Sequence, residues 1–281
     1  MLSNSRGVVL FIAVLVGLSG CGIDDAFKGQ NQKKGIVAIV YSDLTESINE
    51  EIANREKQNI GELFQKLPAA TKFYLFSIDR GTNKPDIYSF APQFTIVRKV
   101  SDQEKVKQEI EENRIAKETT ELAKLNASLN SYHTSITGQK GPVSCIANKL
   151  NSLLDMVGNK TAGHSGYEVR LYFYSDMIEE CENSFDGKPL SFRRDPDDSD
   201  EKKHLQEIQT RVEENFEQAA PPRDLKSMGA KIYIILTSQD DKQTLVTLKK
   251  IWNKLFAKLG FAPEDIVWAN GNEDRFWQVN K

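Results

Sequence analysis

The sequence predicts an α/β protein with a doubly wound, mostly parallel central sheet flanked by helices. The continuous apolar run at residues 35–41 is typical of a strand that is buried on both faces of a sheet, and further strand runs are predicted at residues 72–78, 167–175 and 231–236. Between these runs, apolar residues recur three and four positions apart, as in helices packed on a sheet, over residues 48–67, 146–157, 205–216 and 245–259. Because strands and helices alternate along the chain, we expect the strands to lie parallel.

Shorter segments complete the expected architecture. Residues 86–90 and 94–97 are short strand candidates, so we expect an antiparallel hairpin at one edge of the sheet. Residues 266–268 predict a last short strand. Residues 182–203 form a polar insertion, and its acidic run lacks the glycine and the terminal glutamate of an EF-hand loop. A solvated loop is therefore favoured over a calcium site.

A second insertion, residues 101–135, is long and charged. Ser101 and Glu104 fit a capping box, which predicts that a helix begins here. The apolar residues of this helix are sparse and change phase along it: Val106, Ile110, Ile115, Leu122, Leu125 and Leu129. We favour a solvated helix that lies across the domain edge, and the alternative is an arm that binds a partner.

Residues 1–20 have the features of a lipoprotein signal peptide. Arg6 precedes an apolar stretch over residues 7–18, which is too short for an ordinary transmembrane span. The Leu-Ser-Gly-Cys that ends at Cys21 resembles a bacterial lipobox. This resemblance implies cleavage before Cys21 and lipidation of that cysteine. The alternative is an ordinary signal peptide followed by an incidental cysteine.

The segments after the signal peptide are a polar tether, residues 21–34, and one domain with insertions, residues 35–281. Several acyl chains on Cys21 would hold the protein on a membrane, so the expected location is the bacterial cell envelope. Gly22 in place of aspartate resembles the pattern of outer-membrane proteins that face the periplasm, if the cell is Gram-negative. The charge is almost balanced, with 37 Lys+Arg against 40 Asp+Glu, which argues against a nucleic-acid partner.

Oxygen-bearing side chains follow the strands at the edge where open α/β sheets bind ligands. Asp43, Thr45 and Ser47 come directly after the first strand, and Asp176 ends the strand at 167–175. In a parallel sheet, Asp43 and Asp176 therefore lie at the same edge. Oxygen ligands of this kind suit Mg²⁺, Mn²⁺ or Ca²⁺. The alternative is that Thr45 or Ser47 only caps the next helix and that Asp43 is a turn residue.

These motifs resemble those of the von Willebrand factor type A (VWA) family with a metal-ion-dependent adhesion site. That site combines Asp-x-Ser-x-Ser after the first strand, a threonine before a helix, and an aspartate after a later strand. Asp43, Thr45 and Ser47 match the first part, with threonine in place of the first serine, and Asp176 matches the third. The resemblance implies a Rossmann-like VWA fold over most of residues 35–270.

The second part of the site departs from the family pattern. Ser144 has the spacing to Leu150 that the family shows between its threonine and a leucine of the helix, but it is a serine. Thr137, seven residues earlier, is the alternative ligand. We prefer Ser144, because its distance to Leu150 places it at the start of the helix on the ligand edge of the sheet.

The family resemblance implies a binding protein and not an enzyme. Its hydroxyls bind Mg²⁺ directly, its aspartates act largely through water, and the open position on the ion takes a carboxylate from a partner protein. The sequence has no Gly-x-Ser-x-Gly elbow, no P-loop and no dinucleotide fingerprint. A phosphatase of the haloacid-dehalogenase type needs aspartate where Thr45 stands. A metal-dependent hydrolase, and a structural envelope protein without metal, are the alternatives.

The two remaining cysteines lie next to site residues in the sequence. Cys145 follows Ser144, and Cys181 lies five positions after Asp176, so both are expected near the ligand edge. In an oxidising compartment they form a disulfide; the alternative is two unpaired buried thiols. The histidines, at positions 133, 164 and 204, do not have zinc-ligand spacing with these cysteines.

We expect Cys21→Ser to move the protein from the membrane fraction to the soluble fraction, because the variant has no thiol to carry acyl chains. Fractionation of cells that express each form, followed by immunoblotting, measures this. A full-length variant chain that stays in the membrane fraction would contradict the lipobox interpretation.

Overall fold

The computed structural model describes residues 35–43, 50–78, 87–92, 100–136, 144–147, 167–181, 188–192, 203, 206–211, 214, 229–237 and 242–270. The chain divides into two units, Met1–Gly35 and Ile36–Lys281, and all the elements below belong to the second. The predicted signal peptide, Cys21 and the tether lie outside the described residues. Within the described part of the chain, no helix is long and apolar enough to cross a membrane.

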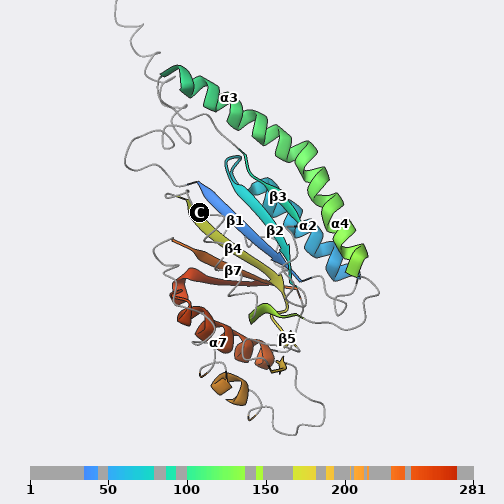
Figure 1. The fold of residues 1–281 in the computed structure, drawn as a ribbon, viewed down its shortest axis with the longest axis vertical. Coiled ribbons are helices and arrows are strands. Elements are labelled where there is room, and N and C mark those ends of the chain that lie inside the picture. The colour runs from blue at the N-terminus through green and yellow to red at the C-terminus, as the bar shows by residue number, and fades with distance from the viewer. Residues whose placement is uncertain are drawn as a thin grey trace, which may run out of the picture. The chain divides into compact units, whose positions relative to one another are not determined.

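The centre of the second unit is a six-stranded sheet in the order β3-β2-β1-β4-β7-β8 (Figure 1). Its strands, in that order, are Tyr88–Phe90, Lys72–Ser77, Ile36–Ser42, Glu168–Ser175, Lys231–Leu236 and Ile266–Asn270. Only β3 pairs antiparallel, with β2, and the other neighbours are parallel. The predicted doubly wound, mostly parallel sheet with an antiparallel edge is confirmed. The second strand expected at that edge, residues 94–97, lies outside the described residues.

The direction of winding reverses between β1 and β4. After β1 the chain adds β2 and β3 on one side, and it then adds β4, β7 and β8 on the other. In a doubly wound sheet, such a reversal opens a crevice at the carboxyl ends of the two central strands, where ligands bind. A separate two-stranded sheet, β5 (Glu180–Cys181) with β6 (Leu190–Ser191), follows β4 in the chain.

Helices cover both faces of the sheet. Successive strand residues point to opposite faces, and in β1 apolar residues are buried on both faces. Val37, Ile39 and Tyr41 of β1 face the cluster that includes α7 (Lys242–Lys258), with Trp252 fully buried. Ala38 and Val40 face the other cluster, which includes α2 (Glu50–Lys66). The buried strands predicted from the sequence therefore have helices packed on both faces of the sheet, as Figure 1 shows for α7 and α2.

The charged insertion is one helical stretch made of α3 (Val100–Ala116), a π-helical turn η2 (Lys117–Glu121) and α4 (Leu122–Ile136). Among the α3 side chains that the structure describes, about half are exposed and only Val106 is buried, as expected for a solvated helix. In α4, however, Leu125 and Leu129 are fully buried in the same core cluster as α2. The stretch is therefore solvated along α3, while α4 belongs to the core.

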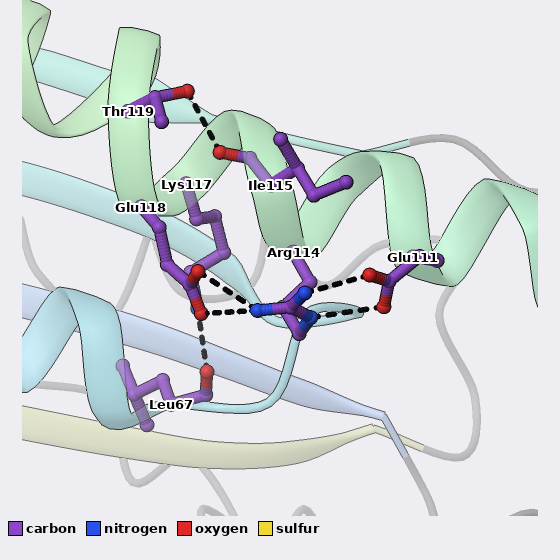
Figure 2. A network of polar contacts seen from close by, with 7 residues as sticks. All are labelled: Leu67, Glu111, Arg114, Ile115, Lys117, Glu118 and Thr119. Carbon is purple, nitrogen blue, oxygen red and sulfur yellow. Dashed lines mark hydrogen bonds and ion pairs between the residues drawn. The ribbon is translucent and has the colours of Figure 1, made fainter.

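The π-helical turn buries a lysine against the end of α2 (Figure 2). Lys117 is 3% exposed, and its Nζ donates to the carbonyl oxygens of Leu67 at 2.5 Å and Pro68 at 3.3 Å. The same ammonium lies 5.0 Å from the centre of the Phe64 ring. The last carbonyls of a helix have no partner within it and attract positive charge, so Lys117 satisfies the end of α2.

The outer side of the same turn is held by exposed contacts. Arg114 pairs with Glu111 at 2.6 Å and with Glu118 at 2.7 Å, and Thr119 Oγ1 donates to the Ile115 carbonyl at 2.8 Å (Figure 2). Exposed ion pairs contribute little to stability. Among the described residues, buried or part-buried contacts join this turn to the rest of the domain: those of Lys117, and the bond that Tyr88 of β3 donates to Glu121 at 2.8 Å.

Lys117 predicts a pH dependence of stability. Burial lowers the pKa of Lys117 from 10.5 to about 8, against an opposing effect of Glu118. Between these two values the unfolded chain keeps a proton that the folded chain has released, so folding becomes more favourable as the pH rises. From pH 8 to 10.5, the free energy of unfolding of wild type should rise relative to that of Lys117→Met, by at most about 1.4 kcal/mol per pH unit.

Urea unfolding at pH 7, 8, 9 and 10 measures this difference. Lys124→Met, which removes an exposed lysine of α4, is the matched control and should give a curve parallel to that of wild type. Parallel curves for wild type and Lys117→Met would contradict the prediction.

Candidate metal centre

The candidate site begins at Asp43, the first residue after β1. Its backbone N–H donates to the Tyr174 carbonyl of β4 at 2.9 Å, which extends the pairing of the two strands by one residue. Its side chain is almost fully buried, with the residue 1% exposed. Asp43 therefore lies at the carboxyl ends of β1 and β4, where the winding of the sheet reverses.

Two serine hydroxyls converge on the Asp43 carboxylate. Ser144 Oγ donates to Oδ1 at 3.1 Å and to Oδ2 at 3.0 Å, and Ser175 Oγ donates to Oδ2 at 2.8 Å. The structure thus brings Asp43 and Ser144 together, as the sequence predicted. Ser175 was not predicted, although its place as the last residue of β4, directly before Asp176, was a usable signal.

Asp176 stands at the start of a constrained turn. Its Oδ1 accepts a hydrogen bond from the Ile178 N–H at 2.9 Å. Met177, between them, has a φ of 61°, which is unfavourable for a residue with a side chain. The Met177 carbonyl accepts a hydrogen bond from Trp252 Nε1 of α7 at 2.8 Å, and the Met177 N–H donates to Ser175 Oγ at 2.9 Å. Packing and hydrogen bonds therefore hold this strained residue, as is typical of ligand sites.

Glu56 of α2 adds a second buried carboxyl group near Asp43. Ser42 Oγ donates to Glu56 Oε1 at 2.6 Å, and Oε2 is buried with no hydrogen-bond partner among the described residues. Burial raises the pKa of Glu56 well above its usual value, against the bond from Ser42, and the charges of Asp43 and Asp176 raise it further.

Glu179 adds a third buried carboxyl group. Its Oε2 accepts a hydrogen bond from the Ala147 N–H at 3.0 Å, and its Oε1 is buried with no partner in the described part of the chain. Burial raises the pKa of Glu179 to about 8; backbone bonds from Ala147 and Ile146 oppose this rise, and the charge of Asp43 adds to it. Sequence reasoning missed both glutamates, because neither lies in the motif.

The chemistry of these residues fits a divalent cation. Buried carboxyl groups with unpartnered oxygens are costly unless protonated or bound to a cation. Within the described ranges, no three His, Cys, Asp or Glu side chains come close enough to hold a metal by themselves. Among the described residues, the Ser144 hydroxyl is a candidate oxygen ligand next to Asp43. The other hydroxyl candidates, Thr45, Ser47 and Thr137, lie outside the described residues.

The predicted disulfide between Cys145 and Cys181 is confirmed. Its Cα atoms are 4.8 Å apart and both residues are buried. Next to it, the Glu180 N–H donates to the Ser144 carbonyl at 3.0 Å. A bridge between cysteines 36 positions apart stabilises a protein by about 4 kcal/mol in the chain-entropy model.

Comparison with known proteins gives distant structural similarities. No protein-family model and no curated protein matches the chain. A structure of proximal thread matrix protein 1 from the mussel byssus is 11% identical, with a TM-score of 0.36, over 85% of this chain and 44% of that one. Another structure of the same mussel protein, with a zinc-occupied metal-ion-dependent adhesion site motif, has a TM-score of 0.32 at 11% identity, with the same coverage of both chains.

Human COPII-coat protein Sec24c is 9% identical, with a TM-score of 0.38, over 89% of this chain and 31% of that one. This chain spans less than half the length of each of these proteins. Since all three TM-scores are below 0.5, the fold class rests on the sheet of this chain and not on these similarities.

Ser175→Ala should destabilise the protein by about 1–3 kcal/mol, because the variant removes one hydrogen bond to the buried Asp43 carboxylate and takes away the partner of the Met177 N–H. Urea unfolding gives the free energies of unfolding. Ser89→Ala, on the exposed side of β3, is the matched control and should cost less than about 0.5 kcal/mol. A Ser175→Ala protein as stable as this control would show that the Ser175 hydroxyl does not support the site.

Proposed function

We propose that this protein is a lipid-anchored lipoprotein of the bacterial cell envelope whose VWA-like domain binds a partner protein through a divalent metal. One observation carries the proposal: the hydroxyls of Ser144 and Ser175 converge on the buried Asp43 carboxylate at the switch point of the sheet. Asp43, Ser144 and Asp176 come from different parts of the chain; the two aspartates match the adhesion-site motif, and Ser144 stands where that motif has a threonine.

Asp43, Ser144 and Asp176, with Thr45 and Ser47, would hold Mg²⁺, or Mn²⁺ or Ca²⁺ in its place, and the ion would supply a binding position for a carboxylate of the partner. The surrounding residues support this role. Burial raises the pKa of Glu56 and of Glu179, which favours the neutral form of each carboxyl group before an ion is bound. A site with few ionised carboxylates leaves an ion attractive to a carboxylate from outside.

Binding, and not catalysis, is the proposed activity. Thr45 stands where a phosphatase of the haloacid-dehalogenase type would have a second aspartate. The charge balance of the chain offers no attraction to nucleic acid. Acyl chains on Cys21 would provide contact with the membrane, and the polar tether would leave the domain free to meet its partner.

Millimolar Mg²⁺ or Mn²⁺ should raise the melting temperature of the chain that begins at residue 21 and carries Cys21→Ser. A ligand that binds only the folded state stabilises it by mass action, by about 2.7 kcal/mol at a hundredfold excess over Kd. This corresponds to about 5–10 °C for a domain of this size. Differential scanning calorimetry with added metal and with EDTA measures the shift.

Variants assign the ligands. Asp43→Ala should abolish the metal-dependent shift, Ser144→Ala should reduce it, and Thr137→Ala should leave it unchanged. A reduced shift in Thr137→Ala, with a normal one in Ser144→Ala, would make Thr137 the ligand. No shift in wild type, together with no heat of binding at millimolar metal, would overturn the metal-site proposal and favour a structural envelope protein without metal.

A further inference from the structure

We infer that the Cys145–Cys181 disulfide and the Glu179 side chain form a clamp that positions Ser144, so that the metal site is complete only in the oxidised chain. This inference rests on the proposed function. The clamp joins two segments, residues 144–147 and residues 176–181, which are far apart in the sequence. It assigns Glu179 as a positioning residue and makes export to an oxidising compartment a condition for metal binding.

Three adjacent links define the clamp. The disulfide joins Cys145 to Cys181, the Glu180 N–H donates to the Ser144 carbonyl at 3.0 Å, and Glu179 Oε2 accepts from the Ala147 N–H at 3.0 Å. The links therefore fix consecutive parts of residues 144–147 against residues 179–181. One link is covalent, one joins two backbones and one uses a side chain. Together they restrain both the position and the orientation of residues 144–147.

The second segment is itself fixed to the sheet. It leaves β4 at Ser175, whose hydroxyl donates to Asp43, and Trp252 of α7 donates to the Met177 carbonyl. Hydrogen bonds to Asp43 and from Trp252 therefore hold the start of residues 176–181 in place beside the proposed metal site. Through the clamp, residues 176–181 hold Ser144 within hydrogen-bonding distance of Asp43.

The hydroxyl of Ser144 would not hold its own segment in place. Fixing a backbone segment costs conformational entropy at every residue, and a single hydrogen bond gives only a small net gain. Without the disulfide or the Glu179 bond, the Ser144 hydroxyl should spend much of its time away from Asp43. Loss of a residue that orients a metal ligand typically weakens metal affinity 10- to 100-fold.

Burial of the disulfide bears on when the bond forms relative to folding. Cys145 and Cys181 are 2% and 4% exposed, so reagents do not reach the bond in the folded chain. The bond must therefore close before or during folding, by exchange with an oxidant disulfide. Two thiols lose two protons and two electrons, and the oxidant is reduced to two thiols. Once formed, the clamp persists, and the site stays competent for metal.

The test measures Mn²⁺ affinity by calorimetry in the chain that begins at residue 21 and carries Cys21→Ser, well below the melting temperature of each variant. Cys145→Ser/Cys181→Ser and Glu179→Ala should each bind Mn²⁺ at least 10-fold more weakly than the parent. Glu179→Gln keeps an oxygen that can accept from the Ala147 N–H, and it should bind within about threefold of the parent, as expected for a positioning role. If the double cysteine variant does not fold, Glu179→Ala, which keeps the disulfide, decides whether the clamp positions Ser144, and failure to fold without the bond itself makes oxidation a condition for the site.

The same substitutions in a Ser144→Ala background separate positioning from general destabilisation. If the clamp acts through Ser144, removing it there should weaken Mn²⁺ binding by no more than about twofold, because contacting residues are not additive. The inference is overturned if the clamp variants bind like the parent, or if they lose as much affinity in the Ser144→Ala background. If the parent itself binds no metal, the proposed function fails, which is a different result from normal metal binding without a clamp.

Discussion

Burial of the Asp43 carboxylate is the constraint on which the rest of the site depends. A carboxylate that leaves water must be hydrogen-bonded, protonated or paired with a cation, because the cost of an isolated buried charge is large. Here the solution is local: a hydroxyl from β4 and a hydroxyl from the segment at residue 144 donate to its two oxygens. Every element that supplies or supports these hydroxyls must keep its place for the carboxylate to stay buried. The geometry of the candidate metal centre therefore depends on the packing of this edge of the sheet.

The winding of the sheet explains why this happens at Asp43. The direction of winding reverses between β1 and β4, and in a doubly wound sheet this leaves a crevice at the carboxyl ends of the two strands. The space is filled by polar groups from α2, from residues 144–147 and from the turn after β4. Trp252 of α7 reaches into that turn and holds the strained Met177. Both helical layers therefore contribute to one polar cluster, although their main contacts are with opposite faces of the sheet.

Polar groups are also buried at a second place, the end of α2, and the two cases differ in a way that bears on function. The Lys117 ammonium has two carbonyl partners and lies over an aromatic ring, so its burial is explained by contacts within the fold. Glu56 and Glu179 each keep a buried oxygen without a partner in the described part of the chain. Such unsatisfied atoms are uncommon in native proteins and call for an explanation. A cation in their vicinity is the explanation that the proposed function provides.

The sequence by itself predicted the fold class and the positions of the main strands, and it indicated that Asp43, Ser144, Cys145 and Cys181 lie at the same edge of the sheet. These follow from local signals: the length of an apolar run and the polar residues at its end are properties of neighbouring positions. Only the tertiary structure decided that Ser175, Glu56 and Glu179 join the site and that α4 is part of the core. Their burial depends on segments distant in the sequence, as with the Ser144 and Asp43 side chains, which are 101 positions apart. Glu56 lies in a helix with many charged residues and is distinguished only by the face that packs on the sheet. A side chain's partners, charge and burial are set by what the fold places around it, which no local pattern contains.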